Sequence, residues 1–235
     1  MKRKRQKGMS KDCPIYGKAI YMDCIDCYER LCNMKTKYKT ISIGIDQSYN
    51  NTGVSISADG KLLLVKSIRL DKYKSNSEKR KLLINKLSEM VNNIKPKGQD
   101  ITCVIERIRL RSQGFINIDY IKSIGALNSV IIDVMSDNNI KVYSVDTRCW
   151  KAQVVGTSKP KNNKYGVPPE KWPTVNWVCE KGFEESILVE VKGRKEKGTF
   201  TDELGKWEYN NDAADSAAIS MFYFKGDKEK LKEEK

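Results

Sequence analysis

The chain has 235 residues, 39% of them hydrophobic and 31% charged, as is typical of a soluble globular protein. Lys and Arg total 44 against 30 Asp and Glu, so the formal net charge is +14, which favours nucleic acid over a membrane as partner. There is no histidine, which excludes histidine triads, general bases and metal ligands on this chain. Without an apolar run of roughly 18 residues or a signal-peptide core, we expect a cytoplasmic protein.

The N-terminal part of the chain differs in composition from the rest. Residues 1–11 are a basic tail, either a solvated extension or an arm that grips DNA. Residues 12–38 contain a cysteine cluster, whose members are Cys13, Cys24, Cys27 and Cys32. Four thiolates around Zn²⁺ would fold a segment too short to fold alone, so a structural zinc module is favoured. Because there is only one C-x₂-C pair, the alternative of incidental cysteines stays open.

From residue 39 onward, strand-like and helix-like patterns alternate. The first three segments predict strands at Thr40–Asp46, Gly53–Ala58 and Lys61–Leu70, the last two joined by the hairpin signal Asp59-Gly60. Then come a helix, a strand, a helix, a strand and a final helix, at Ser77–Ile94, Ile101–Glu106, Ile118–Asp137, Ile140–Asp146 and Asn211–Phe224. This order predicts an RNase H-like α/β domain over residues 39–225, with a mixed five-stranded sheet flanked by helices. The charged tail, residues 226–235, either extends the last helix or frays.

Four carboxylates are placed where they could converge. Asp46 and Glu106 end strands that would share the carboxyl edge of the sheet if they are parallel neighbours. Asp212 and Asp215 lie three residues apart on a helix and therefore on one face. Such a cluster would repel itself unless cations lie within it, and Mg²⁺ or Mn²⁺ prefer oxygen ligands of this kind. Asp146 also ends a strand, but is expected to cap the following helix.

At these residues the sequence resembles the RuvC-type Holliday junction resolvases. The segments Ile43-Gly44-Ile45-Asp46 and Val104-Ile105-Glu106 resemble their first two acidic strands. Asp212-Ala213-Ala214-Asp215-Ser216-Ala217 resembles their terminal acidic helix, and Lys151-Ala152-Gln153-Val154-Val155-Gly156 resembles their basic stretch near the scissile phosphate. The insertion between residues 183 and 209 and the cysteine module look more like phage-encoded relatives, which would act in the host cytoplasm.

The resemblance implies a structure-selective endonuclease that cuts four-way junctions as a homodimer. Asp46, Glu106, Asp212 and Asp215 would bind two Mg²⁺ or Mn²⁺ ions per active site, and Lys151 would stabilise charge on the phosphate. A second phosphate contact would come from Lys159, Lys161 or Lys164. The third residue after the glutamate is commonly aromatic in bacterial members but is Arg109 here, so phosphate contacts from Arg107, Arg109 and Arg111 are expected instead.

Two other functions remain open from the sequence. One is another RNase H-like nuclease, acting on RNA–DNA hybrids or in transposition. The other is a non-catalytic zinc DNA-binding module whose acidic residues are structural. The spacing of Asp212 and Asp215, together with the Lys151 stretch, favours the junction nuclease.

Overall fold

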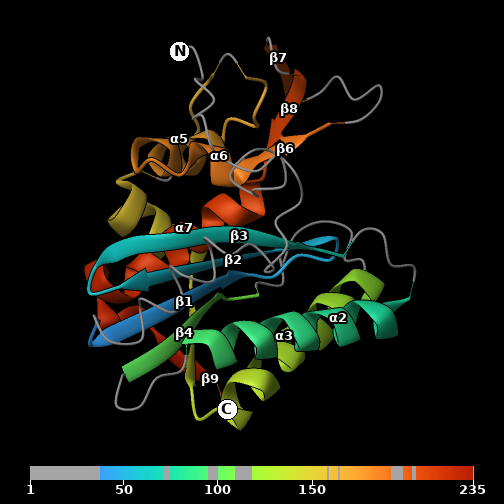
Figure 1. The fold of residues 1–235 in the computed structure, drawn as a ribbon. Helices are drawn as coiled ribbons and strands as arrows, with labels where there is room; N and C mark the ends of the chain where they lie inside the picture. The colour runs from blue at the N-terminus through green and yellow to red at the C-terminus, as the bar shows by residue number, and fades with distance from the viewer. Residues whose placement is uncertain are drawn as a thin grey trace, which may run out of the picture.

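A six-stranded mixed sheet lies at the centre of the molecule, with helices on both faces (Figure 1). The structure is a computed structural model and describes residues 38–70, 75–94, 100–108, 118–157, 159–163, 165–191, 198–202 and 205–234. The strand order in the sheet is β3-β2-β1-β4-β5-β9. The strands of this sheet are β1 (Thr40–Asp46), β2 (Asn51–Ala58), β3 (Lys61–Arg69), β4 (Asp100–Glu106), β5 (Lys141–Val145) and β9 (Lys232–Glu234).

The first three strands form an antiparallel meander, and the next two are added in parallel. Asp59 and Gly60 join β2 to β3 with φ values of 44° and 78°, the left-handed conformation that tight hairpin turns require. β4 pairs with β1 and β5 with β4 in parallel, each after a helix that crosses over the sheet, α2 (Asn76–Ile94) and α3 (Ile118–Asp137). The RNase H-like fold expected from the sequence is thereby confirmed.

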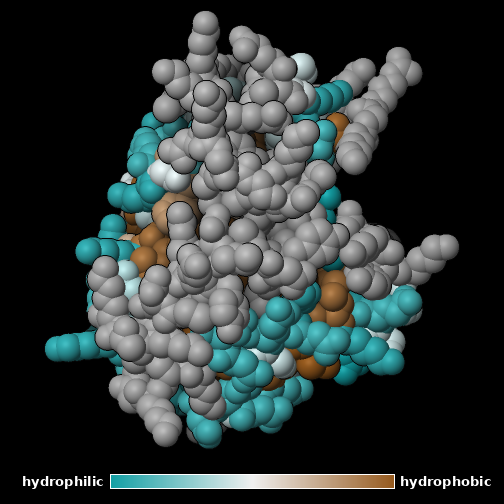
Figure 2. Space-filling view, viewed as in Figure 1, coloured by the Kyte–Doolittle hydropathy of each residue, from teal (hydrophilic) through white to brown (hydrophobic). Residues whose placement is uncertain are grey.

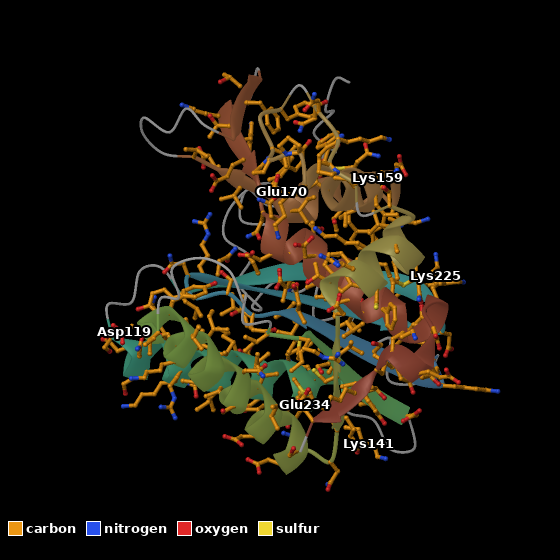
Figure 3. The ribbon with its side chains drawn as sticks, turned by 180° about the vertical axis from the view of Figure 1, so that it is seen from behind. Asp119, Lys141, Lys159, Glu170, Lys225 and Glu234 are labelled. Atoms are coloured by element: carbon orange, nitrogen blue, oxygen red, sulfur yellow. The ribbon has the colours of Figure 1, made fainter. Side chains whose placement is uncertain are left out.

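The sixth strand corrects the expectation of five. The charged C-terminal residues were expected to extend a helix or fray, but β9 pairs antiparallel with the outer edge of β5. Lys141 and Glu234 lie at this edge in Figure 3, and Lys141 Nζ is 3.9 Å from a Glu233 carboxylate oxygen. This strand is held by main-chain pairing at an exposed edge rather than by buried side chains, so no hydrophobic alternation marks it.

The alternation of side chains along each strand divides the interior into two layers. Ile41, Ile43 and Ile45 of β1 are fully buried in the core on the side of α2 and α3. The intervening residues Ser42 and Gly44 point to the opposite face, which is covered by α7 (Asn211–Lys225). Asp46 continues this second series, so the period of two places its carboxylate on the α7 side of the sheet.

Helix α7 lies against the sheet almost backbone to backbone. A Cβ atom at Gly53 would lie 1.9 Å from the Asp212 carbonyl oxygen, and one at Gly44 would lie 2.3 Å from the Ser216 carbonyl oxygen. The Ser55 hydroxyl, also on this face, donates to the Ser216 carbonyl oxygen at 2.6 Å. Small residues on strand and helix therefore set the distance between them.

A second, smaller unit forms between β5 and α7. It contains α4 (Thr147–Trp150), a π-helical turn (Lys151–Val155), α5 (Trp172–Glu180) and α6 (Glu184–Ile187). A three-stranded antiparallel sheet follows in the order β6-β8-β7, from β6 (Leu188–Glu190), β7 (Thr199–Asp202) and β8 (Gly205–Tyr209). Its rings gather in one cluster, made of Tyr165, Trp172, Phe200 and Tyr209.

The surface over α2 and α3 is mostly hydrophilic, with small hydrophobic areas between the hydrophilic ones (Figure 2). None of the helices in the described residues is long and apolar enough to cross a bilayer.

Candidate active site

Asp46 and Glu106 lie at the ends of neighbouring parallel strands. β1 and β4 are in register up to Ile45 and Ile105, so the next residue on each strand is one of the two acids. On β4, Cys103 and Ile105 face the α2 and α3 core, whereas Val104 faces the α7 layer. The alternation therefore directs Glu106, like Asp46, to the α7 side, at the carboxyl edge where open α/β sheets bind ligands.

Asp212 and Asp215 reach the same edge from the first turns of α7. The Asn210 side chain caps the helix by accepting a hydrogen bond from the Ala213 N–H at 2.9 Å. Asp212 lies in the first turn of α7, near the positive end of the helix dipole. Asp215 is almost completely buried, with a side-chain exposure of 1%, and Asp212 is half-buried.

Three of the four carboxyl groups, those of Asp46, Glu106 and Asp212, have raised pKa values. Burial raises the pKa of Asp46 well above its usual range, and repulsion from Glu106, Asp215 and Asp212 raises it further. Burial is also the largest cause of the raised pKa values of Glu106 and Asp212, with repulsion from Asp215 adding to both. The cluster is therefore a buried concentration of negative charge that calls for a cation.

Lys171 provides a positive charge within this cluster, and the sequence analysis did not identify it. Its Nζ atom is 2.5 Å from Asp215 Oδ2. Burial lowers the pKa of this ammonium, but attraction from Asp215, and then from Asp46, outweighs that effect and raises it. Lys171 precedes α5 and lies 44 residues from Asp215 along the chain. In the sequence, Lys171 is distinguished from the many other lysines only by its place directly before a Trp-Pro pair that begins a helix.

Lys151 lies beside the cluster but is not bonded to it. Its side chain is buried, with 8% exposure, and Nζ donates to the backbone carbonyl oxygen of Glu170 at 3.1 Å. Lys151 is close enough to Glu106 to lower the pKa of that carboxyl group. The carbonyl that it binds belongs to the residue before Lys171, so Lys151 fixes the segment that carries the second lysine.

Three neutral side chains complete the walls of the cluster. Gln47 Nε2 donates to the Glu106 carbonyl oxygen at 2.6 Å, and Asn51 Nδ2 donates to Asp212 Oδ2 at 3.3 Å. The Thr147 hydroxyl donates a short hydrogen bond to the Glu106 carboxylate. The remaining amide oxygens of Gln47 and Asn51, and Oδ1 of Asp215, are buried and have no hydrogen-bond partner among the described residues. Unpaired buried oxygen atoms are costly unless a cation or water accompanies them.

As they stand, these carboxylates are not gathered into a metal site. No group of three or more acidic or cysteine side chains in the described part of the chain is arranged to hold a metal ion. The Lys171 ammonium instead supplies the positive charge, through its bond to Asp215. The chemistry of the donor set, carboxylates with unpaired oxygen atoms beside them, nevertheless suits a hard divalent cation.

The expected DNA-contact residues are only partly described. Arg107 is half-buried, and its guanidinium donates to the Ser144 hydroxyl at 3.3 Å. Lys159 and Lys161 are exposed, and Figure 3 shows Lys159 in the part of the molecule away from α2 and α3. Neither lysine is bonded to the acidic cluster in any contact of the described residues. Arg109, Arg111, Lys164 and the four cysteines of the expected zinc module lie outside the described residues.

Asp146 and the three described cysteines are not part of the acidic cluster. Asp146 is the N-cap of α4, because its carboxylate accepts from the Arg148 N–H at 2.9 Å, as expected. Cys103 is fully buried in the core. Cys149 and Cys179 are both partly exposed. Burial nevertheless raises the pKa of Cys179 to about 12, so this thiol is unreactive at neutral pH.

Comparison with known proteins identifies the fold. A structure of Thermus thermophilus RuvC in complex with a Holliday junction substrate superposes with a TM-score of 0.52 at 12% identity, covering 83% of this chain and 99% of that one. A second structure of Thermus thermophilus RuvC gives a TM-score of 0.50 with the same identity and coverage. No family model matches the sequence, and no curated protein matches it. The chain therefore has the RNase H-like fold of RuvC, at a sequence identity that shows the fold alone.

Proposed function

We propose that this protein is a structure-selective DNA endonuclease that resolves four-way junctions by metal-dependent phosphodiester hydrolysis. The observation that carries the proposal is the convergence of Asp46, Glu106, Asp212 and Asp215 at the carboxyl edge of β1 and β4. This arrangement occurs on the fold of RuvC, a protein whose structure is known in complex with a Holliday junction substrate. The net charge of +14 suits a DNA partner.

The four carboxylates would hold Mg²⁺ or Mn²⁺, two ions per active site by the resemblance to RuvC-type resolvases. Such ions supply a water of lowered pKa and stabilise the leaving oxygen. The unpaired oxygen atoms of Gln47, Asn51 and Asp215 support a cation at this place, since each is an acceptor that lacks a donor. Gln47 and Asn51 would orient Glu106 and Asp212 through the hydrogen bonds that they already donate.

Lys171 and Lys151 would act on the phosphate group of the DNA rather than on the cations. Lys171, which is bonded to Asp215 in the structure, would neutralise a phosphate oxygen if a divalent cation took over the charge of that carboxylate. Lys151 would hold the Glu170–Lys171 segment in place and contribute long-range positive potential beside Glu106. The Lys151 ammonium has three N–H donors and donates one to the Glu170 carbonyl oxygen, so the phosphate contact expected from the sequence stays part of the proposal.

Several finer features of the proposal rest on the sequence alone. The protein would act as a homodimer, because two cuts on opposing strands need two acidic clusters related by a two-fold axis. Arg107, Arg109 and Arg111 would contact phosphates near the glutamate, and Lys159, Lys161 or Lys164 would add a further contact. The four N-terminal cysteines would bind one structural Zn²⁺.

The test is to incubate the purified protein with Mg²⁺ and three substrates: a four-way junction, a plain duplex and an RNA–DNA hybrid. We expect cleavage of the junction only, and no cleavage by the Asp46→Asn variant. Preferential cleavage of the hybrid would assign the chain to another RNase H-like activity. Binding without cleavage of any substrate would leave the acidic cluster without a catalytic role.

A further inference from the structure

The turn between β1 and β2, residues 47–50, links three of the four acids. It follows Asp46 directly and leads into Asn51, which donates to Asp212 Oδ2 at 3.3 Å. Within the turn, Gln47 donates to the backbone carbonyl of Glu106 at 2.6 Å. A shift of this turn would therefore move Asp46 relative to both Glu106 and Asp212.

A single buried lysine from α2 holds this turn. Lys79 Nζ donates to the Tyr49 carbonyl oxygen and to Asn50 Oδ1, each at 3.1 Å. The same ammonium lies 3.4 Å from the centre of the Tyr49 ring, a cation–π distance. Lys79 is only 3% exposed. Three contacts thus converge from one side chain onto two consecutive residues of the turn.

The helix start that carries Lys79 is itself fixed. Ser75 and Glu78 form a reciprocal cap, in which the Ser75 N–H donates to Glu78 Oε2 at 3.1 Å and the Glu78 N–H donates to Ser75 Oγ at 3.2 Å. Lys79 is the next residue, and its N–H donates to the Ser75 carbonyl oxygen at 3.1 Å. The lysine is therefore attached to a rigid point of the scaffold.

Packing alone does not account for a lysine at this position. A buried ammonium loses its hydration, and in the first turns of a helix it also meets the positive end of the helix dipole. A methionine could fill a similar space without either cost. The hydrogen bonds of Lys79 go to a neutral carbonyl and a neutral amide oxygen of the turn.

We propose that Lys79 is a positioning residue, whose ammonium clamps the β1–β2 turn and so keeps Asp46, Glu106 and Asp212 in their relative places. It acts through Tyr49 and Asn50 and touches neither DNA nor a cation. The inference rests on the proposed function for its catalytic consequence, but the clamp itself is a property of the folded chain.

The experiment compares Lys79→Met and Lys79→Arg with Asn50→Ala, which removes one acceptor from an exposed position. Lys86→Met is the matched control, since Lys86 lies on the same helix and, among the described residues, bonds to the nearby Glu89 at 3.0 Å. Two quantities are measured well below each melting temperature: amide hydrogen exchange of residues 47–51, and single-turnover cleavage of a four-way junction beside its dissociation constant.

For Lys79→Met we expect faster exchange in the turn and cleavage slowed roughly 10- to 100-fold at unchanged junction affinity, the effect of slightly misplaced reacting groups. Lys79→Arg should restore part of the rate, Asn50→Ala should show a smaller loss, and Lys86→Met should behave as wild type. Unchanged exchange in both Lys79→Met and Asn50→Ala would overturn the clamp. Faster exchange with an unchanged cleavage rate would make Lys79 purely structural and overturn its positioning role.

The exchange measurement does not depend on catalysis, so the two proposals fail separately. If wild type cuts no substrate, the nuclease proposal fails, and the exchange of residues 47–51 still decides whether Lys79 holds the turn. If Lys79→Met does not fold, Asn50→Ala carries both measurements, because its exposed side chain contributes little to the core.

Discussion

Replacing Lys171 by Met removes the positive charge that the structure places among the carboxylates. Breaking a buried ion pair by removing one partner costs about 3–5 kcal/mol. The Lys171 side chain is 32% exposed, so water would replace part of the lost interaction. We therefore expect the free energy of unfolding to fall by about 2–3 kcal/mol. For a domain of this size 1 kcal/mol corresponds to roughly 2–4 °C in Tm, so the variant should melt roughly 4–12 °C lower.

A divalent cation should reverse this loss. With the ammonium gone, Mg²⁺ or Mn²⁺ can neutralise Asp215 and its neighbours without first displacing a bonded lysine. Adding either ion should therefore raise the Tm of Lys171→Met more than it raises that of wild type. Because the measurement needs no DNA, it reports on the cluster independently of cleavage.

The assay is thermal unfolding of wild type, Lys171→Met and Lys181→Met, each in a chelator and in Mg²⁺. Lys181 is an exposed lysine at the other end of α5, so its variant controls for the loss of one positive charge. An unchanged Tm of Lys171→Met in chelator would show that the ammonium does not offset the carboxylate charge. Equal stabilisation of all three proteins by Mg²⁺ would refute competition between Lys171 and the cation.

Four further predictions follow from other features of the chain. Asp46→Asn should stabilise the metal-free protein by about 1–2 kcal/mol at weakly alkaline pH. Because the folded-state pKa of Asp46 is raised, its contribution to stability is present at low pH and lost as pH rises, so this gain should vanish near pH ~4 in pH-dependent melting curves. Gly53→Ala would put a Cβ 1.9 Å from the α7 backbone and should cost about 3 kcal/mol in denaturant unfolding, whereas Gly125→Ala, in open space on α3, should not destabilise. Elemental analysis should find about one zinc per chain, lost on Cys24→Ser or Cys27→Ser, and zinc-free wild type would remove the zinc module. Mixed wild-type and Asp46→Asn protomers should give mostly single nicks in a junction, and undiminished double cutting would exclude a dimer with one cluster per protomer.

The regular elements could be predicted from the sequence because their patterns are local. β1 and α3 have the bounds that their hydrophobic periodicities indicated, and α2 differs by one residue at its start. The acids Asp46 and Glu106 could be placed on one edge of the sheet because each is the last residue of a short buried strand. In each case the relevant signal lies within a window of one element.

Lys171 and β9 could not be predicted because each depends on a distant partner. Lys171 follows a stretch with little regular structure, and only the folded chain brings it to Asp215. β9 consists of charged residues whose strand conformation comes from pairing with β5. The positions of the four acids in the sequence indicate that the cluster needs a positive charge. They do not indicate which lysine supplies it.

The direct contact between α7 and the sheet affects how freely the sequence can change. At Gly44 and Gly53, main-chain atoms of the helix rest against the strands, so no side chain acts as an adjustable spacer between them. The isoleucines of β1 pack on the opposite side, where substitutions can be accommodated by movement of α3. Substitutions in the core below β1 should therefore leave the position of the acidic cluster unchanged. Stabilising substitutions can be tried there first, provided that Lys79 is kept.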